Sequence, residues 1–140
     1  MPVIKDLKSI PTFEETNGEH ELHKNGKYIY LLKEDDDCSV VDVFLESDEC
    51  TGMTFVATLS YFLDEDMPLI DYAVVSPEHR NKGIMTELYK FMVELYGVLA
   101  SDTQISFHAE KIWKKLGKIY TLTDESLDGD MAITRYVLRK

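Results

Sequence analysis

The spacing of apolar and polar residues changes once along the chain. From Met53 to Tyr61 the two kinds alternate, so that every second residue shares one face, which is typical of a half-buried strand. From Ile84 to Leu95 the apolar residues recur every three or four positions, which predicts an amphipathic helix. The chain is therefore expected to begin as sheet and to form its first clear helix after residue 83.

Further elements follow from the same kind of pattern. Runs rich in β-branched and aromatic residues predict strands at 28–33, 39–45, 69–75, 102–107 and 133–138. A second helical stripe runs from Ala109 to Leu116 and ends at Gly117, and Gly97 stands where the first helix needs a C-terminal cap. Four strands, a helix, a strand, a helix and a strand predict an α/β (α+β) fold with helices packed on a sheet.

The first 26 residues carry weaker signals. Thr12 with Glu15 three positions later predicts a capping box that opens a short helix. Asn17-Gly18 and Asn25-Gly26 predict turns. His20-Glu21-Leu22-His23 is one residue short of the zinc motif HExxH. We therefore expect a polar loop there and no metal.

Composition adds an uneven distribution of charge. The 140 residues are 44% apolar, enough for one domain spanning 1–140, and 15 Lys+Arg against 26 Asp+Glu give a net charge of −11. Such an acidic balance argues against nucleic-acid binding. Residues 1–66 hold 16 acids and 5 bases, whereas the remainder holds 10 of each. The acidic part is either a solubilising face or a surface with its own partner.

Nothing in the chain predicts a membrane or secreted protein. No stretch approaches the roughly 18 apolar residues of a membrane span, and Lys5, Asp6 and Lys8 interrupt the apolar run that a signal peptide needs. Cys38 and Cys50 match no metal-binding spacing. The expected compartment is the cytoplasm, with no disulfide.

The junction between the strand ending at Val75 and the helix starting at Ile84 carries the strongest chemical signal. The segment Arg80-Asn81-Lys82-Gly83 precedes the helix, whose first amides lack partners and carry partial positive charge. A glycine lets an anion approach that backbone, and Arg80 and Lys82 add formal charge. The chain contains neither GxxxxGK[ST] nor GxGxxG. The junction thus predicts a phosphate site of another kind.

Here the sequence resembles the GNAT superfamily of N-acetyltransferases. The family signature [Q/R]-x-x-G-x-[G/A] appears as Arg80-x-x-Gly83-x-Met85. A second family pattern, N-x-x-A-x-x-x-Y-x-K-x-G-F, falls on Ser106, Ala109, Trp113, Lys115 and Gly117. The resemblance covers residues 53–120, and SDTQISFHAEKIWKKLG also resembles small phage-encoded members, which would place the protein in the host cytoplasm. It implies a mixed, mostly antiparallel sheet flanked by helices, with a shortened N-terminal helical region.

The resemblance also implies where the co-substrate acetyl-CoA binds. Backbone amides from Arg80 to Thr86 would hold its pyrophosphate, and Val74 and Val75 would offer strand-edge groups to its pantetheine arm and thioester. The implied cofactor-binding residues are Val74, Val75, Arg80, Asn81, Lys82, Gly83, Ile84, Met85, Thr86, Ser106 and Trp113. The other interpretation is that they are ordinary strand and helix-cap residues. Met85 replaces a small residue of the family, so the backbone there would approach the phosphates less closely.

The proton-transfer residues are less clearly marked. Asp71 is the only carboxylate in the strand 69–75, and burial among apolar neighbours would raise its pKa toward that of a general base. A strand-end carboxylate satisfied by water, or a relay to Glu78, stays open. Trp113 replaces the tyrosine that often protonates the leaving thiolate in this family, and it also fits the apolar stripe of its helix. Tyr120, Tyr72 or Tyr89 could substitute as the acid.

Two functions are consistent with these residues. The first is transfer of an acetyl group from acetyl-CoA to an amine acceptor by direct attack in a ternary complex. The acidic residues suit a cationic acceptor such as a polyamine, a small amine or a protein lysine. The second is a catalytically degenerate member that binds a basic partner. Either would be a monomer or a homodimer. Two roles are also open for four lysines, which either steer coenzyme phosphates or form a solvated helix face: Lys111, Lys114, Lys115 and Lys118.

Overall fold

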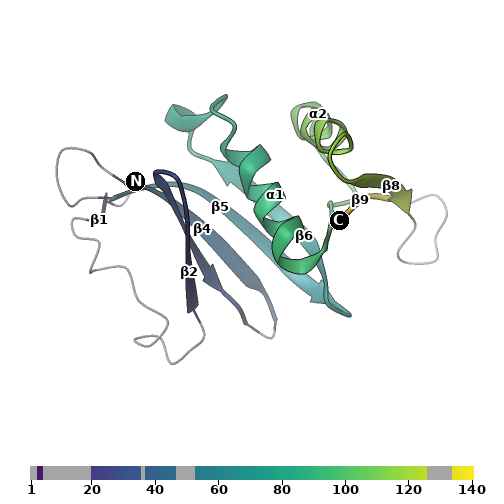
Figure 1. Cartoon of the computed structure of the whole chain (residues 1–140), viewed down its shortest axis with the longest axis horizontal. Coiled ribbons are helices and arrows are strands. Elements are labelled where there is room, and N and C mark those ends of the chain that lie inside the picture. Colours follow the sequence, from purple (N-terminus) through teal and green to yellow (C-terminus); the bar gives the residue numbers. More distant parts are fainter. Residues whose placement is uncertain (1–2, 5–19, 36, 47–52, 126–133) are drawn as a thin grey trace. The chain divides into compact units, whose positions relative to one another are not determined.

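The computed structural model describes residues 3–4, 20–35, 37–46, 53–125 and 134–140 (Figure 1). The elements are β1 (Val3–Ile4), β2 (His20–Asn25), β3 (Tyr28–Lys33), β4 (Ser39–Glu46), β5 (Met53–Asp64), β6 (Met67–Val75), a 3₁₀ turn (Pro77–His79), α1 (Ile84–Tyr96), β7 (Val98–Ala100), α2 (Phe107–Leu116), β8 (Thr121–Glu125) and β9 (Arg135–Arg139). They fall into two compact units, residues 1–60 with 73–80, and residues 61–72 with 81–140. The strands β5 and β6 contribute to both units, and each unit is described by itself. The expectation of a single domain over 1–140 stays a prediction.

The first unit is an antiparallel meander of β2, β3 and β4, followed by parts of β5 and β6. The β2–β3 turn is the predicted Asn25-Gly26, with Gly26 at φ +61°, the left-handed conformation that tight hairpin turns require. In the pairing of β3 with β4, Ile29 lies opposite Phe44. These two residues pack with Leu31 in a buried cluster, against which Phe55 lies. Tyr30 and Leu32 on the other face of β3 are buried as well, so this strand has apolar core on both of its faces.

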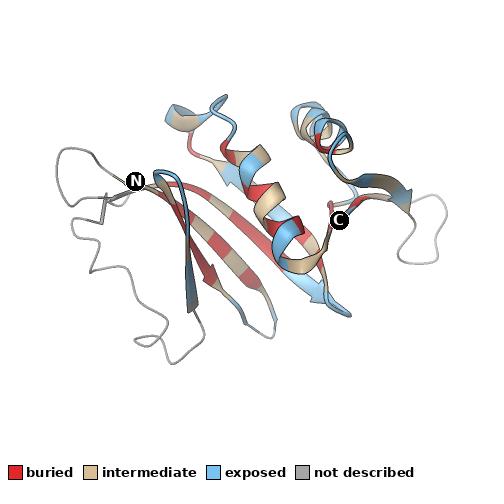
Figure 2. Ribbon diagram, viewed as in Figure 1, coloured by how far each residue is buried: buried red, intermediate tan, exposed pale blue. Residues whose placement is uncertain are grey.

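The second unit combines the ends of β5 and β6 with β7, β9 and β8, in that order across the sheet. β6 and β7 are parallel, whereas β9 is antiparallel to both β7 and β8. The helix α1 buries Leu88 and Met92, and its opposite side is exposed (Figure 2). Gly97 caps it with φ +81° and donates its N–H to the Val93 carbonyl at 2.7 Å. The predicted helix and its cap are confirmed.

The fold class is confirmed: the sheet is mixed and mostly antiparallel, with two helices. Three details of the expectation were wrong. The strand expected at 102–107 lies earlier, at Val98–Ala100, and Phe107 already belongs to α2. The segment expected to be a polar loop is the strand β2, and β8 was not predicted at all. Both are end strands of the strand order, with several exposed side chains, so no clear apolar alternation marks them.

Some expectations fall on residues outside the described part of the chain. They are the short helix at Thr12–Glu15, the turn at Asn17-Gly18, the shortened N-terminal helical region, and Cys50. Cys38 has a free thiol and is half-buried. Among the described residues, none of the helices has the length and apolar character needed to cross a membrane, and no three metal-ligating side chains come together.

Candidate functional site

The turn that leaves β6 belongs to the first unit and is closed at both ends. The His79 amide donates to the Ser76 carbonyl at 2.9 Å, which completes the 3₁₀ turn that Pro77 opens. Arg80 Nε then donates to the Val75 carbonyl at 3.2 Å, so the side chain returns to the last residue of the strand. The remaining guanidinium nitrogens belong to an exposed side chain. The turn therefore holds Arg80 by one nitrogen and leaves its charge at the surface.

The start of α1 belongs to the second unit and is built by backbone alone. Asn81 has φ +62° and Gly83 has φ +76°, and no side chain caps the helix. The first intrahelical bond runs from the Glu87 amide to the Gly83 carbonyl at 3.0 Å. The amides of the three preceding helical residues, Ile84, Met85 and Thr86, therefore have no intrahelical partner. A Cβ added to Gly83 would meet no atom within 4 Å, so open space adjoins these amides.

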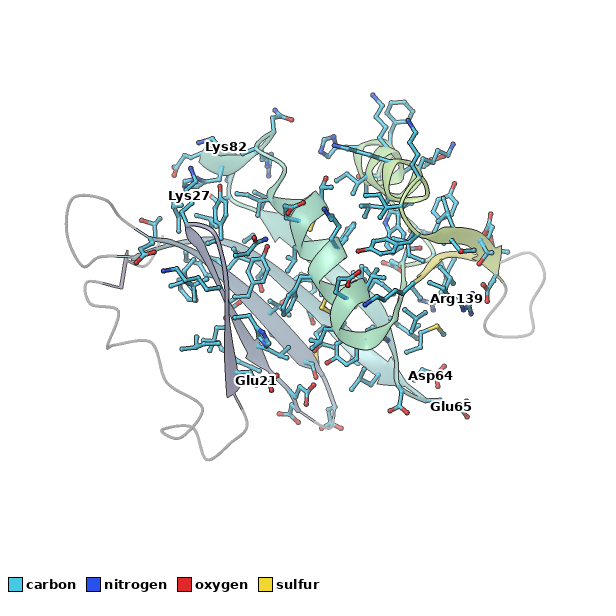
Figure 3. The ribbon with its side chains drawn as sticks, in the orientation of Figure 1. Glu21, Lys27, Asp64, Glu65, Lys82 and Arg139 are labelled. Atoms are coloured by element: carbon cyan, nitrogen blue, oxygen red, sulfur yellow. The ribbon has the colours of Figure 1, made fainter. Side chains whose placement is uncertain are left out.

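The charges around this start suit an anion. Lys82 is exposed in the loop that leads into α1 (Figure 3). The partial positive charge of the helix N-terminus adds to the charge of Lys82. Uncapped amides, an adjacent cation and open space at a glycine are the features of a phosphate-binding helix N-terminus. The phosphate site at Arg80–Thr86 stays a prediction.

The start of α2 is built in the opposite way. Ser106 Oγ accepts a hydrogen bond from the Ala109 amide at 3.0 Å, so this helix carries its own cap. Ser106, predicted to bind the co-substrate, already uses its hydroxyl oxygen in that bond. The next residue, Phe107, is 75% exposed, and Lys111 Nζ lies 4.6 Å from the centroid of its ring. The sequence pattern did not single out Phe107.

The strand β6 continues past its partner β7. Within the described residues, the two strands pair at Leu69 and Ala100, where β7 ends. Val74 and Val75 lie beyond that point on β6 and have no partner on β7; Val74 is 50% exposed. Their role toward a pantetheine arm stays a prediction, and the Val75 carbonyl already accepts the hydrogen bond from Arg80 Nε.

Asp71 lies on the same part of β6 and is exposed. The expectation that its apolar neighbours bury it was wrong: Ile70 beside it is buried, whereas Asp71 is exposed, because successive side chains of a strand point to opposite faces. Glu78, the alternative carboxylate, is exposed as well. Burial therefore gives no reason to choose either residue as a general base.

Trp113 packs in the core rather than at a surface site. Trp113 is fully buried between Tyr89, at 5.1 Å between ring centroids, and Tyr136, at 6.4 Å. Burial raises the pKa of Tyr89 to about 12. The interpretation of Trp113 as part of the helix stripe is therefore the better one.

Tyr120 is engaged elsewhere. Its hydroxyl donates to Glu94 Oε2 at 2.8 Å. Desolvation and this hydrogen bond raise the pKa of Tyr120 to about 12. Transfer of its proton to a thiolate, whose ordinary pKa is about 8.5, would be uphill, and these properties argue against an acid role. A sequence cannot reveal such a partnership, because Glu94 and Tyr120 lie on different elements.

Comparison with known proteins identifies the family of the chain. The sequence profile of the Acetyltransferase (GNAT) family matches residues 4–116. Among solved structures, an acetyltransferase of the GNAT family from Staphylococcus aureus aligns with a TM-score of 0.51 and 13% identity, over 74% of this chain and 68% of that chain. An IAA acetyltransferase from Bacillus cereus aligns with a TM-score of 0.46 and 12% identity, over 72% and 75%. Nourseothricin acetyltransferase aligns with a TM-score of 0.47 and 17% identity, over 85% and 81%. The chain has no significant match among curated protein sequences.

Proposed function

Because the chain belongs to the acetyltransferase (GNAT) family, we propose that it transfers the acetyl group of acetyl-CoA to an amine acceptor. The observation that supports this proposal best is the start of α1. Gly83 leaves three amides uncapped beside Lys82, and nothing within 4 Å fills the space that a side chain there would take. A pyrophosphate fits such a start, because its oxygens accept hydrogen bonds from the amides and its charge meets a cation.

The roles of the other residues follow from the proposed binding of the co-substrate. Acetyl-CoA supplies an activated thioester when it is bound. Val74 and Val75 would hold the pantetheine arm and orient the thioester carbonyl through their backbone groups. The acceptor amine attacks that carbonyl directly, and the thiolate leaves without a protonating side chain. Such a departure is feasible because a thiol has an ordinary pKa of about 8.5.

Asp71 remains the proposed proton acceptor. The reason is its position on β6 and its contact with water, and not burial. It is a carboxylate of β6 three residues before Val74, and it is exposed to water. An exposed carboxylate can hydrogen-bond the attacking nitrogen and relay to water the proton that this nitrogen loses once the C–N bond has formed. Substitution of Asp71 by asparagine should therefore lower kcat more than it changes the Kd for acetyl-CoA.

The proposed acceptor is cationic: a polyamine, a small amine or a protein lysine. In the second unit, Asp64, Glu65 and Asp66 are exposed where β5 turns into β6; Asp64 and Glu65 are marked in Figure 3. In the first unit, Asp42 accepts bonds from Lys33 at 2.7 Å and from Thr58 at 2.8 Å, so its charge is already balanced. Unbalanced carboxylates raise the local concentration of a cation. The expected cytoplasmic location and the expected state of monomer or homodimer stay predictions.

The test measures acetyl-CoA binding and acetyl transfer separately. At about 100 times its Kd, acetyl-CoA should stabilise the protein by about 2.7 kcal/mol in thermal unfolding. Release of free coenzyme A thiol with a panel of amines then reports turnover. An unchanged unfolding curve with acetyl-CoA would overturn the proposal, and binding without turnover on any amine would contradict its catalytic part.

A matched pair of variants locates the site. Gly83 and Gly97 flank the same helix, with φ +76° and +81°, and a Cβ at either meets no atom within 4 Å. Alanine should therefore cost similar stability at both, about 1–2 kcal/mol for a left-handed residue. Gly83→Ala should also weaken acetyl-CoA binding by about tenfold, the loss of one good hydrogen bond to a charged group, while Gly97→Ala should not. Equal affinities for the two variants would show that the start of α1 is not the phosphate site.

A further inference from the structure

The strand β2 lies at one end of the sheet. It is the first strand in the spatial order and pairs with β3 along one edge, and within the described part of the chain no strand pairs with its other edge. Such an edge presents a row of N–H and C=O groups that can serve as a template for another strand. What the edge can bind depends on the residues that it presents.

The β2–β3 hairpin determines which backbone groups face outward. Asn25 lies opposite Tyr28 across the turn at Gly26, and the pair of residues that closes a two-residue turn exchanges hydrogen bonds. Alternate residues of β2 then point their N–H and C=O groups away from β3. These outward-facing residues are Lys24, Leu22 and His20.

The side chains of the edge are apolar on one face and polar on the other. Leu22 is 37% exposed and lies opposite Leu31 of β3. Because Leu31 belongs to the buried cluster with Ile29 and Phe44, Leu22 continues this apolar row to the edge of the sheet. On the other face, Glu21 Oε2 lies 3.5 Å from His23 Nε2 (Glu21 is marked in Figure 3). The edge therefore carries one exposed apolar residue between an acid and a histidine.

We propose that β2 pairs with β2 of a second copy of this chain, antiparallel, about a two-fold axis that passes through Leu22. In such an isologous contact the same surface is used on both copies. With the axis at this position, Leu22 lies opposite the partner's Leu22, and each Glu21 lies opposite the partner's His23. The outward-facing backbone groups of the two strands then hydrogen-bond to each other, and the two sheets become continuous. The proposal does not depend on acetyl transfer.

The side chains favour this register over the others that the edge allows. Outward-facing groups must meet outward-facing groups, so the axis passes through a residue and not between two residues. An axis through Glu21 or through Lys24 would place like charges opposite each other, which is destabilising. An axis through His23 would place each Leu22 opposite an ammonium group of Lys24. The axis through Leu22 instead joins two exposed apolar side chains and lets each carboxylate accept a hydrogen bond from an imidazole.

Sedimentation equilibrium of the full chain measures the association. One pair of strands is a smaller contact than a standard protein interface, so we expect a reversible equilibrium of monomer and dimer in the micromolar range. Leu22→Lys removes the apolar contact and places two ammonium groups opposite each other, and it should raise the dimer Kd by about tenfold. Leu95→Lys is the matched control, because Leu95 is a leucine of α1 with 38% exposure; it should leave the Kd unchanged.

An exchange of the acid and the histidine tests the register. His23→Glu places a second carboxylate opposite each Glu21 and should weaken dimerisation by about threefold. Adding Glu21→His restores one carboxylate and one imidazole to every pair, so this double variant should dimerise like the wild type. With the axis at His23, the double variant would instead bring two glutamates together and would not recover.

Three results would overturn the proposal. They are a wild type that stays monomeric even at millimolar concentration, a dimer that Leu22→Lys leaves intact, and a double variant that dimerises no better than His23→Glu. Far-UV circular dichroism checks that each variant is folded. If Leu22→Lys does not fold, the comparison of His23→Glu with the double variant decides the question.

Discussion

The helices α1 and α2 begin in different ways, although both follow a strand of the same sheet. At α1 the N-cap is Gly83, in the left-handed region, and no side chain reaches the first amides. At α2 the N-cap is Ser106, with φ −70° and ψ 160°, and its Oγ accepts from the Ala109 amide at 3.0 Å. The positive N-terminus of α1 is therefore open to an external anion. At α2 the Ser106 side chain already satisfies one of the first amides.

The two kinds of helix start have different consequences for the stability of the helix and for ligand binding. A self-capped helix gains about 1 kcal/mol from its cap and has less need of an anion. An uncapped helix forgoes that stabilisation and keeps amides that a ligand can occupy. The helix that lacks a cap is therefore the better candidate for a binding site, and the one with a cap is the better control. The following predictions test this contrast, from the largest expected effect to the smallest.

Removal of the serine cap should affect folding. Ser106→Ala should lower the free energy of unfolding by about 1 kcal/mol, and Ser106→Gly by only a few tenths, because glycine is itself an acceptable N-cap. Urea denaturation measures both. Ser106→Thr keeps a hydroxyl oxygen at the same place and serves as the control. If the alanine variant is as stable as the wild type, the bond to the Ala109 amide contributes nothing and the contrast between the helices disappears.

Removal of the lysine charge before α1 should affect binding. Lys82→Gln should weaken acetyl-CoA binding by about threefold at low salt, which is the range expected for one exposed charge. The loss should shrink as salt rises, because the Debye length falls to about 3 Å at 1 M. Lys82→Arg keeps the charge and should bind like the wild type. A loss that is independent of salt would point to an altered loop conformation.

The first turn of α2 should respond to pH through Glu110. The hydrogen bond from Lys114, together with the charge of Lys114, lowers the pKa of Glu110 below its ordinary 4.5. A carboxylate with a lowered pKa stabilises the fold above its ordinary value and loses that effect as the pH falls through the lowered one. Glu110→Gln should therefore be slightly less stable than the wild type at pH 7 and indistinguishable from it well below pH 4.5.

A double-mutant cycle with Lys114→Gln tests the same pair. The coupling between the two substitutions, measured by chemical denaturation, should be present at pH 7 and vanish at low pH. Coupling that persists when the carboxyl is protonated would show that the 2.9 Å contact between Lys114 and Glu110 is not what lowers the pKa.

Much of the architecture could be predicted because its causes are local. The helical stripe of α1 follows from how the backbone presents side chains to one face. The strand β5 was also predicted, although it is buried on both faces and not on one: Val56 and Ala57 are both buried. Gly97 ends α1 as expected, because a left-handed cap residue favours glycine. The strand-to-helix junction at Arg80–Gly83 was also predicted from its residues, since the start of a helix depends on a few neighbouring positions.

What the sequence could not supply concerns neighbours that lie far away along the chain. Asp71 has an apolar sequence context, yet its side chain is exposed, whereas that of Ile70 beside it on β6 is buried. The Tyr120 hydroxyl is held by Glu94, and Trp113 is enclosed by Tyr89 and Tyr136. Periodicity measures which side of an element a residue takes, whereas burial and protonation depend on what tertiary packing brings to that side. The sequence alone thus determined the family, the main elements and the glycine at the start of α1; only the tertiary structure decided which side chains face solvent.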